Sequence, residues 1–541
     1  MTQSAHPITL YDTTLRDGSQ GEDILFSVED KLRIAQKLDG LGVDFIEGGW
    51  PGANPKDEAF FQKARGLTLN KSRLVAFGST RRAGVKAEAD VVLAGLLRAQ
   101  TQAITIFGKS WDLHATRALG ISLEENLELI FDSIAFLKSR VETVFFDAEH
   151  FFDGYKANAP YALKVLDSAR EAGADALILC DTNGGSMVSE VAEITALAVA
   201  RGGSIGIHCH NDTALAVANT LAAVEAGALH VQGTINGIGE RCGNADLTAV
   251  IANLAIKMKR PTTLTGDQVG QLKAVSGFLN EISNRQPRKN QPFVGLSAFA
   301  HKGGIHVSAV LKDPITYEHI DPESVGNQRR ILVSEQAGRS NLFYKLQEFG
   351  LQEVSAKDPR VKKLLEEIKT LEHRGYQFDG AEASFEIRAR RALGEMPDYF
   401  SLKGFRVIDE RRVRDDGERW FGAEAAVKVE VAGKQVHLID EGAGPVDALH
   451  GALSKALERT YPTINDMELV DYKVRILNGG GTGATVRVQI EWRDQNRIWG
   501  TVGVSDHIIA ASYDAMVEAV IYKLFKDGAS PAQSLSQVDH G

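Results

Sequence analysis

In SIGIHCHND, at 204–212, a short apolar run ends in two histidines, an asparagine and an aspartate, and it is one of eight such runs. Strict alternation of such runs with longer amphipathic segments indicates parallel strands covered by helices. Eight repeats in about 250 residues match a (β/α)8 TIM barrel, an α/β fold, better than an open sheet. The eight expected strands are 8–12, 44–49, 74–79, 103–108, 143–149, 176–182, 204–210 and 230–237.

The helical segments carry their own start signals. Ser27 is followed three residues later by Asp30, and Ser122 by Glu125, which is the capping-box spacing. Apolar residues recur at three- and four-residue spacing over 122–140, which predicts one buried helix face. No G-x-G-x-x-G motif follows the first expected strand, and this disfavours a dinucleotide-binding sheet.

Reactive side chains gather where the expected strands end, whereas the strand beginnings are bland. In a TIM barrel the active site lies at the carboxyl ends of the strands, so this asymmetry indicates an enzyme. The polar ends are TTLRDG (13–18), EGG (47–49), DAEH (147–150), DTN (181–183), HCHND (208–212) and, beyond the eighth strand, GERCGN (239–244).

A metal site is the chemistry that these ends favour. His208 and His210 are two apart on one strand, so both side chains leave the same face. Asp17 ends the strand that closes the barrel against the eighth, and Asn244 follows the eighth. Two nitrogen and two oxygen donors suit a catalytic Mn²⁺, Mg²⁺ or Zn²⁺. The alternative is a chance histidine pair with satisfied hydrogen bonds.

Three further residues have both a catalytic and a structural interpretation. Arg16 can hold a carboxylate or stabilise a developing oxyanion, or simply pair with a carboxylate of a neighbouring strand. Glu149 can orient a base or a water, or neutralise an arginine. Thr182 can donate to a substrate carboxylate, or cap the next helix.

These motifs resemble those of the DRE-type barrel metalloenzymes, which catalyse Claisen condensations or the reverse cleavages. The relevant runs are DTTLRDGSQGED (12–23), HCHND (208–212) and GERCGNAD (239–246). AFAHKGGIH (298–306) and TYEHIDPESVGN (316–327) narrow the resemblance to the 2-isopropylmalate, homocitrate and citramalate synthase branch. EGGWPGANPKD (47–57) and the segment 371–394 look most like its citramalate-forming members.

The resemblance implies a role for each candidate residue. Asp17, His208, His210 and Asn244 become the metal ligands, Arg16 and Thr182 hold the oxo acid, and Glu149, His306 and Tyr317 transfer protons. The implied reaction joins acetyl-CoA to pyruvate, giving (R)-citramalate and CoA for isoleucine biosynthesis by way of 2-oxobutyrate.

His306 and Tyr317 follow the barrel in sequence, so the resemblance implies that they reach over its mouth, in the family from the partner subunit of a homodimer. The bland interpretations are a histidine on a helix face and a packed aromatic ring. His301 is a competing candidate for the histidine.

The sequence predicts four parts: a catalytic barrel (1–265), helical linker subdomains over the active site (266–395), a regulatory domain (396–530) and a flexible tail (531–541). The third part reads as a duplicated βββα unit, with Asp447-Ala448-Leu449 repeated 67 residues later as Asp514-Ala515-Met516. It resembles the leucine-binding domain of isopropylmalate synthases, which implies an isoleucine effector here.

Composition sets the outer limits. The chain has 541 residues, 43% of them hydrophobic, and a formal charge of −10, which argues against nucleic-acid binding. We expect no membrane span, no signal peptide and a cytoplasmic location. Three cysteines make no disulfide framework, and we interpret them as small buried groups near the site.

Three alternatives remain open on sequence grounds. The same chemistry can use 2-oxoisovalerate or 2-oxoglutarate, making the protein a 2-isopropylmalate or homocitrate synthase. The barrel can instead run the reverse cleavage, as in 3-hydroxy-3-methylglutaryl-CoA lyases. An inactive barrel serving as an amino-acid sensor or scaffold is the third.

Overall fold

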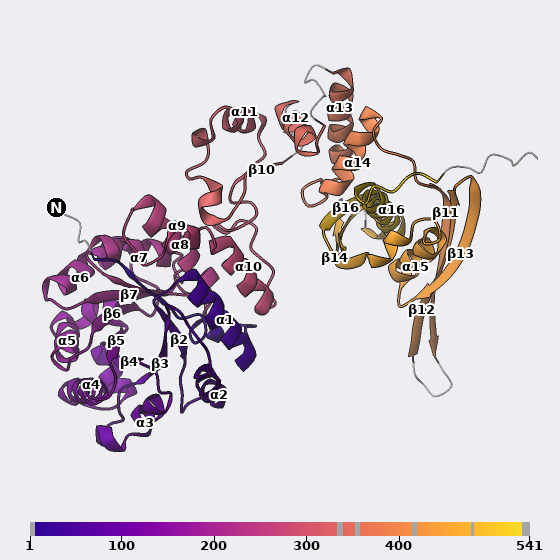
Figure 1. Ribbon diagram of the computed structural model, residues 1–541. Helices are drawn as coiled ribbons and strands as arrows, with labels where there is room; N and C mark the ends of the chain where they lie inside the picture. The colour runs from indigo at the N-terminus through magenta and orange to yellow at the C-terminus, as the bar shows by residue number, and fades with distance from the viewer. Residues whose placement is uncertain (1–5, 333–338, 352–357, 414–418, 478–480, 533–541) are drawn as a thin grey trace, which may run out of the picture. The chain divides into compact units, whose positions relative to one another are not determined.

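The computed structural model describes residues 6–332, 339–351, 358–413, 419–477 and 481–532 (Figure 1). The chain divides into two compact units. The first comprises the chain up to Phe299 together with Glu318–Arg329, and the second comprises Ala300–Tyr317 and the chain from Arg330 onward. Most of the predicted tail, from residue 533, lies outside the described residues.

The first unit is a closed barrel of eight parallel strands, as predicted. Each strand pairs with the next, and β1 also pairs with β8, so that Thr9 lies opposite His230 and Asp12 opposite Gly233. The strands are β1 (Thr9–Asp12), β2 (Phe45–Gly49), β3 (Arg73–Ser79), β4 (Ala103–Lys109), β5 (Thr143–Glu149), β6 (Ala176–Asp181), β7 (Ile205–Cys209) and β8 (His230–Gly233).

Helices surround the barrel, one after each strand (Figure 1). Ser27 forms the predicted capping box with Asp30, and the Ser122 hydroxyl accepts a hydrogen bond from the Glu125 amide. The helices are α1 (Val28–Leu41), α2 (Pro55–Ala64), α3 (Val91–Arg98), α4 (Leu123–Lys138), α5 (Phe151–Glu171), α6 (Val188–Ala200), α7 (Ala216–Glu225) and α8 (Leu247–Ala252), followed by α9 (Gly266–Val269) and α10 (Leu272–Ile282).

Helix α5 begins earlier than the sequence pattern indicates. A helix was expected from Pro160, but α5 starts at Phe151 and is interrupted at Asn158, whose φ of −152° and ψ of 77° are not helical. Proline disfavours a helical conformation in the residues just before it, so the sequence signal marks only the second segment. The Asn158 side chain accepts a hydrogen bond from the Tyr161 amide at this restart.

The barrel interior is layered. Near the strand beginnings, Tyr11, Phe45, Phe145 and the imidazole of His230 pack ring against ring, with centroids 4.9–6.4 Å apart. We call these four rings the aromatic plug. Tyr11 connects the plug to the polar layer above it, because its hydroxyl donates to Glu47 Oε2 at 2.6 Å. The barrel is therefore closed at one end and polar at the other.

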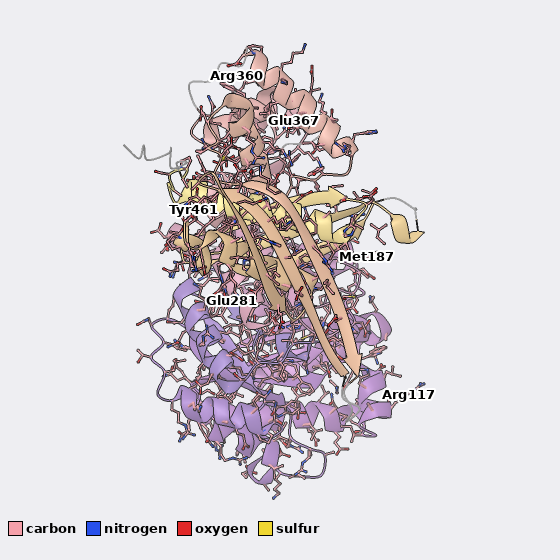
Figure 2. All side chains as sticks on the ribbon, turned by 90° about the vertical axis from the view of Figure 1, so that its right-hand side faces the viewer. Arg117, Met187, Glu281, Arg360, Glu367 and Tyr461 are labelled. Atoms are coloured by element: carbon pink, nitrogen blue, oxygen red, sulfur yellow. The ribbon has the colours of Figure 1, made fainter. Side chains whose placement is uncertain are left out.

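The second unit opens with a small helical region. The strands β9 (Ala300–His301) and β10 (Arg330–Ile331) pair in parallel. The helices are α11 (Gly304–Lys312), α12 (Arg339–Glu348), α13 (Pro359–His373) and α14 (Glu382–Leu393). Apolar side chains of α12, α13 and α14 form one core. The exposed Arg360 and Glu367 of α13, labelled in Figure 2, lie beside α14 and contact Leu393 and Arg388 of that helix.

The remainder is the predicted duplicated βββα unit. The first copy is β11 (Ser401–Val413), β12 (Arg419–Val431), β13 (Lys434–Gly442) and α15 (Pro445–Leu457), and its strands form a long antiparallel sheet (Figure 2). The second copy is β14 (Glu468–Ile476), β15 (Val486–Arg493), β16 (Ile498–Ser505) and α16 (Ile508–Lys526). The two copies share a single apolar core.

Two further expectations concern the surface and the cysteines. None of the helices in the described parts of the chain has the length and apolarity needed to span a membrane. Cys180 and Cys209 are buried as expected, but Cys242 is exposed, so the expectation of burial is wrong for that residue. Cys242 lies in the loop after β8, which turns outward between Arg241 and the buried Gly243.

Candidate functional site

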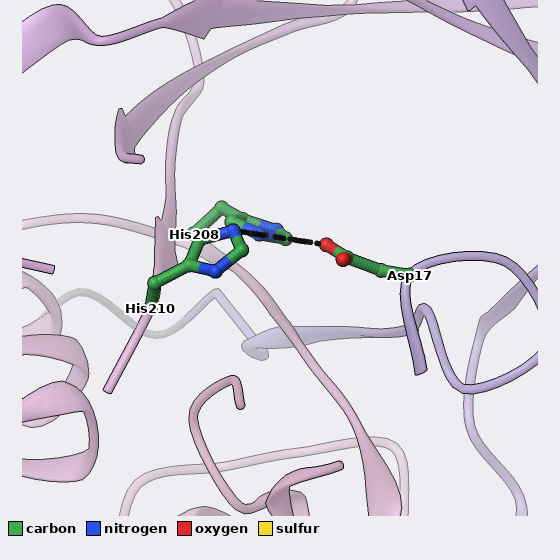
Figure 3. Close-up of side chains that lie close together, drawn as sticks. All are labelled: Asp17, His208 and His210. Atoms are coloured by element: carbon green, nitrogen blue, oxygen red, sulfur yellow. Dashed lines mark hydrogen bonds and ion pairs between the residues drawn. The ribbon is translucent and has the colours of Figure 1, made fainter. Parts of the chain in front are cut away.

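Three side chains converge at the carboxyl ends of the strands (Figure 3). Asp17 lies just after β1, His208 lies on β7, and His210 lies one residue beyond β7. The Nε2 atom of His208 is 3.2 Å from Asp17 Oδ2 and 3.3 Å from His210 Nε2, and His210 Nε2 is 3.9 Å from the same carboxylate oxygen. All three residues are buried.

This donor set fits a divalent metal ion. Two imidazole nitrogens facing each other and a carboxylate can direct their lone pairs at one cation. Asn244 is their neighbour in the fold, because its backbone pairs with that of His210. Asn244 Oδ1 is buried, and no hydrogen-bond partner for it is found among the described residues. The structure thus brings three predicted ligands together and places the fourth next to His210.

Burial and mutual charge set the protonation of the site. Burial alone raises the pKa of Asp17, but Arg16 and His208 together lower that pKa well below its usual value. For His208, burial lowers the pKa, and the Asp17 carboxylate outweighs it, so the pKa lies above its ordinary value. Burial and the neighbouring His208 lower the pKa of His210 to about 4. The site therefore holds an ionised carboxylate beside a neutral imidazole at neutral pH.

Arg16 forms the structural ion pair considered for it and still faces the site, as its binding role requires. Its Nε donates to Glu47 Oε1 at 2.6 Å, and Glu47 is fully buried, so the structural ion pair exists. Its Nη2 lies 3.7 Å from Asp17 Oδ2, and its guanidinium stacks 3.8 Å from the centre of the Phe77 ring. Glu47 therefore fixes an arginine that still faces the Asp17 carboxylate.

A cavity of about 250 Å³ contains the site. Arg16, Glu149 and Thr182 line it, so these predicted residues lie around the same space. One wall is aromatic and consists of Trp50, Phe77 and Phe107, with ring centroids 5.6–6.0 Å apart. A small cavity with convergent cationic and polar groups and an apolar wall suits a short acid.

The partners of Glu149 and Thr182 differ from those considered in the sequence. Glu149 forms an ion pair with Lys109 of the adjacent strand rather than with an arginine. The Thr182 hydroxyl oxygen accepts a hydrogen bond from the His150 amide at 2.8 Å. This contact leaves the hydroxyl hydrogen of Thr182 able to donate to a ligand.

His306 and Tyr317 belong to the second unit. His306 lies on α11, and Tyr317 follows a short turn after that helix, with the two ring centroids 4.4 Å apart. Tyr317 is 47% exposed, so its ring packs against His306 on one side and remains open to solvent on the other. The competing His301 lies on β9. The proton-transfer roles of His306 and Tyr317 stay predictions.

Three buried polar residues inside the barrel were given no role by the sequence patterns, although Glu47 and Asp147 belong to the polar strand ends. Glu47 holds Arg16, Gln232 contacts His208, and Asp147 contacts Gln232. The signal was present, because a polar side chain within a short apolar run has to find a buried partner. The runs DFIEGG (44–49) and HVQGTING (230–237) both contain one.

Three successive segments of the chain each match a known protein family. Residues 7–276 match the HMGL-like family, residues 293–376 the homocitrate synthase post-HMGL domain-like family, and residues 379–524 the LeuA allosteric (dimerisation) domain. The first match covers the barrel that holds the three converging ligands.

Relatives extend the similarity over nearly the whole chain. An (R)-citramalate synthase of Geobacter sulfurreducens is 54% identical over 96% of this chain and 98% of the relative. An (R)-citramalate synthase of Aquifex aeolicus is 52% identical over 97% of this chain and 99% of the relative. A probable 2-isopropylmalate synthase of Methanopyrus kandleri is 34% identical over 95% and 97%. By its eight-stranded barrel, its domain matches and these identities, the chain belongs to the (R)-citramalate synthase family.

Proposed function

We propose that this protein condenses acetyl-CoA with pyruvate and hydrolyses the product to (R)-citramalate and CoA, in a reaction that depends on a divalent metal. The observation that carries the proposal is the convergence of Asp17, His208 and His210 inside a cavity of about 250 Å³. The 54% identity to an (R)-citramalate synthase supports pyruvate over the larger oxo acids and over a cleavage reaction.

The chain's own residues bind and orient the oxo acid. Arg16, fixed by Glu47, presents its guanidinium to the carboxylate and to the oxygen that becomes negative as the carbon–carbon bond forms. Thr182 donates its hydroxyl hydrogen to the same carboxylate. Asp17, His208, His210 and Asn244 would hold the metal, which supplies Lewis-acid polarisation of the oxo group when bound.

The proton transfers are assigned to Glu149, His306 and Tyr317. Removal of a methyl proton from acetyl-CoA yields an enolate, whose carbon attacks C2 of pyruvate. The new alkoxide takes up a proton, and water then cleaves the thioester to a carboxylate and the CoA thiol. Glu149 lines the cavity with Lys109 as its partner, a position suited to holding or moving one of these protons.

The assembly and its regulation form the second part of the proposal. The match of 379–524 to a domain described as allosteric and dimerising supports a homodimer in which 396–530 binds isoleucine and lowers activity. In this division 1–265 is the catalytic barrel, 266–395 the linker that carries His306 and Tyr317, and 531–541 a tail. Isoleucine biosynthesis and a cytoplasmic location remain predictions.

The substrate is tested by measuring CoA release with a panel of 2-oxo acids, with and without a chelator. We expect pyruvate to have the highest kcat/KM and the chelator to abolish turnover. A higher kcat/KM for 2-oxoisovalerate or 2-oxoglutarate would overturn the citramalate assignment. Turnover that survives complete metal removal would overturn the metal assignment.

Complementation tests whether His306 acts across the dimer. In a mixed dimer of His208→Ala and His306→Ala subunits, one site has both intact groups only if His306 comes from the partner. We therefore expect co-expressed variants to recover activity that neither homodimer has. Mixed dimers as inactive as the parents would show that the two histidines act within one chain.

The effector is tested with the full chain and free isoleucine. We expect millimolar isoleucine to lower turnover, with leucine and valine as size controls. If turnover measured with saturating pyruvate and acetyl-CoA does not change when isoleucine is added, the regulatory assignment is wrong.

A further inference from the structure

One amide inside the barrel lies between a metal-binding histidine and a buried acid. Gln232 on β8 is fully buried, and it lies directly opposite His208 of β7 in the parallel register. Its Oε1 is 2.9 Å from His208 Nδ1, and its Nε2 donates to Asp147 Oδ1 at 3.1 Å. The three residues come from β7, β8 and β5, so the chain of contacts crosses the barrel interior.

The order of these contacts fixes the orientation of the amide. In the structure the NH2 group of Gln232 donates to Asp147 Oδ1, which is the arrangement that an ionised carboxylate requires; burial raises the pKa of Asp147 to about 7, so we expect this arrangement to hold fully above that pH. The amide oxygen then faces His208, and it can only accept a hydrogen from Nδ1. A ring that keeps its proton on Nδ1 is the tautomer whose Nε2 lone pair is available to a metal.

The second histidine has no such support. His210 Nδ1 is buried, and no hydrogen-bond partner for it is found in the described part of the chain. Both Nε2 atoms nevertheless face each other at 3.3 Å. The polar contact to Gln232 therefore distinguishes one ligand from the other.

We infer that Gln232 is a positioning residue for the metal site: held by Asp147, it keeps the proton of His208 on Nδ1 and the Nε2 atom aimed at the cation. The inference rests on the proposed metal site and adds a residue that does not itself touch the metal. Partners of this kind change metal affinity or activity by about 10- to 100-fold when removed.

The first test measures Mn²⁺ binding by the full chain, using calorimetry and without substrates. Gln232→Met keeps the side-chain volume and removes the acceptor, so we expect the Kd for Mn²⁺ to rise about tenfold or more. Asn219→Leu is the matched control: Asn219 is also a fully buried barrel amide, but it donates to the Ser186 carbonyl at 2.9 Å. We expect its Kd to match that of the unmodified protein.

The second test looks at the proton itself. In the Zn²⁺-loaded protein labelled with ¹⁵N-histidine, we expect His208 Nδ1 to carry a slowly exchanging proton. That signal should exchange rapidly or disappear in Gln232→Met and persist in Asn219→Leu. A merely space-filling role for Gln232 would leave this signal unchanged. Where Gln232→Met fails to fold, the spectrum of the unmodified protein still tests the inference, because a His208 Nδ1 without a proton would overturn it.

The third test exchanges the amide and the acid. In Asp147→Asn with Gln232→Glu, the new carboxylate accepts from His208 Nδ1 on one side and from the new amide on the other. We expect this double variant to bind Mn²⁺ at least as tightly as the unmodified protein, whatever its activity.

The possible outcomes distinguish a failure of the metal site from a failure of the role of Gln232. Unmodified protein that binds no Mn²⁺ would overturn the metal site itself. Tight binding that is equal in the unmodified protein and Gln232→Met, or a His208 Nδ1 without a proton in the Zn²⁺ form, would overturn the role of Gln232 alone.

Discussion

The two ends of one barrel are built from the same eight strands but from opposite kinds of side chain. Near the strand beginnings, Tyr11, Phe45 and Phe145 pack around His230. At the strand ends, Asp17 and His208 face each other in a layer of buried charge. Both ends contain imidazoles, and both bury them almost completely.

The difference lies in what each imidazole contacts. His230 is surrounded by rings, and burial lowers its pKa to about 3, so it serves as a neutral packing group. His208 contacts a carboxylate and an amide, so both of its nitrogens have polar partners. The residue type alone therefore does not define the role of a buried histidine. The position along the strand decides whether the imidazole packs among rings or contacts polar groups.

The largest expected effect comes from His208→Ala. Loss of one nitrogen ligand should lower kcat by about 1000-fold or more, which corresponds to at least about 4 kcal/mol of transition-state stabilisation. The barrel should remain folded, as judged by circular dichroism. His230→Phe is the matched control, since it removes an imidazole from the aromatic end of the barrel. Equal losses of activity in both variants would contradict the different roles of the two barrel ends.

Glu47→Gln should produce the next largest effect. It removes the charge of a fully buried carboxylate that pairs with the largely buried Arg16, and breaking such a pair costs about 3 kcal/mol. We expect a lower barrel unfolding temperature in calorimetry and a higher KM for pyruvate. Glu58→Gln on α2, where Glu58 is 4.0 Å from Arg98 in an exposed pair, should change stability by less than about 1 kcal/mol. Similar behaviour of the two variants would contradict the role of Glu47.

The pH dependence of stability probes the aromatic end. The pKa of His230 is about 3 in the folded protein against about 6.5 when unfolded, so the unfolded chain binds more protons below pH 6.5. Stability contributed by this histidine is therefore lost as pH falls, by about 2 kcal/mol at pH 5. Denaturant unfolding from pH 7 to 5 should show a smaller loss in His230→Phe, and parallel curves would refute the assignment.

Phe145→Leu should have the smallest effect. Phe145 packs edge to face against Phe45 at 4.9 Å, and a smaller apolar replacement in this plug costs about 1 kcal/mol. We expect unchanged Mn²⁺ affinity and unchanged KM for pyruvate. A shift in either constant would show that the two ends are coupled through the strands.

The sequence predicted the features that depend on a single strand or loop. The eight alternating runs indicated the barrel, and H-x-H at 208–210 indicated two side chains on one face. It did not predict contacts that depend on the register between strands. Glu149 meets Lys109 only because β4 and β5 pair at that position, and Gln232 meets His208 only because β7 and β8 do.

The aromatic plug was missed for a related reason. Phe45 and Phe145 are a hundred residues apart and come from strands that are not neighbours, so no local pattern links them. Their contact follows from barrel closure, which brings inward-facing side chains of different strands into one layer. Sequence periodicity shows which side chains turn inward, but not which ones meet.

The pairing of β1 with β8 has a consequence for synthesis of the protein. Asp17 is made early and His208 and His210 much later, so the growing chain has no metal site until seven strands have emerged. A cation that binds only the closed form stabilises that form by mass action. Such a cation would link Asp17, which follows the first strand, to His208 and His210 at the seventh. We therefore expect that metal supplied during translation favours closure of the barrel.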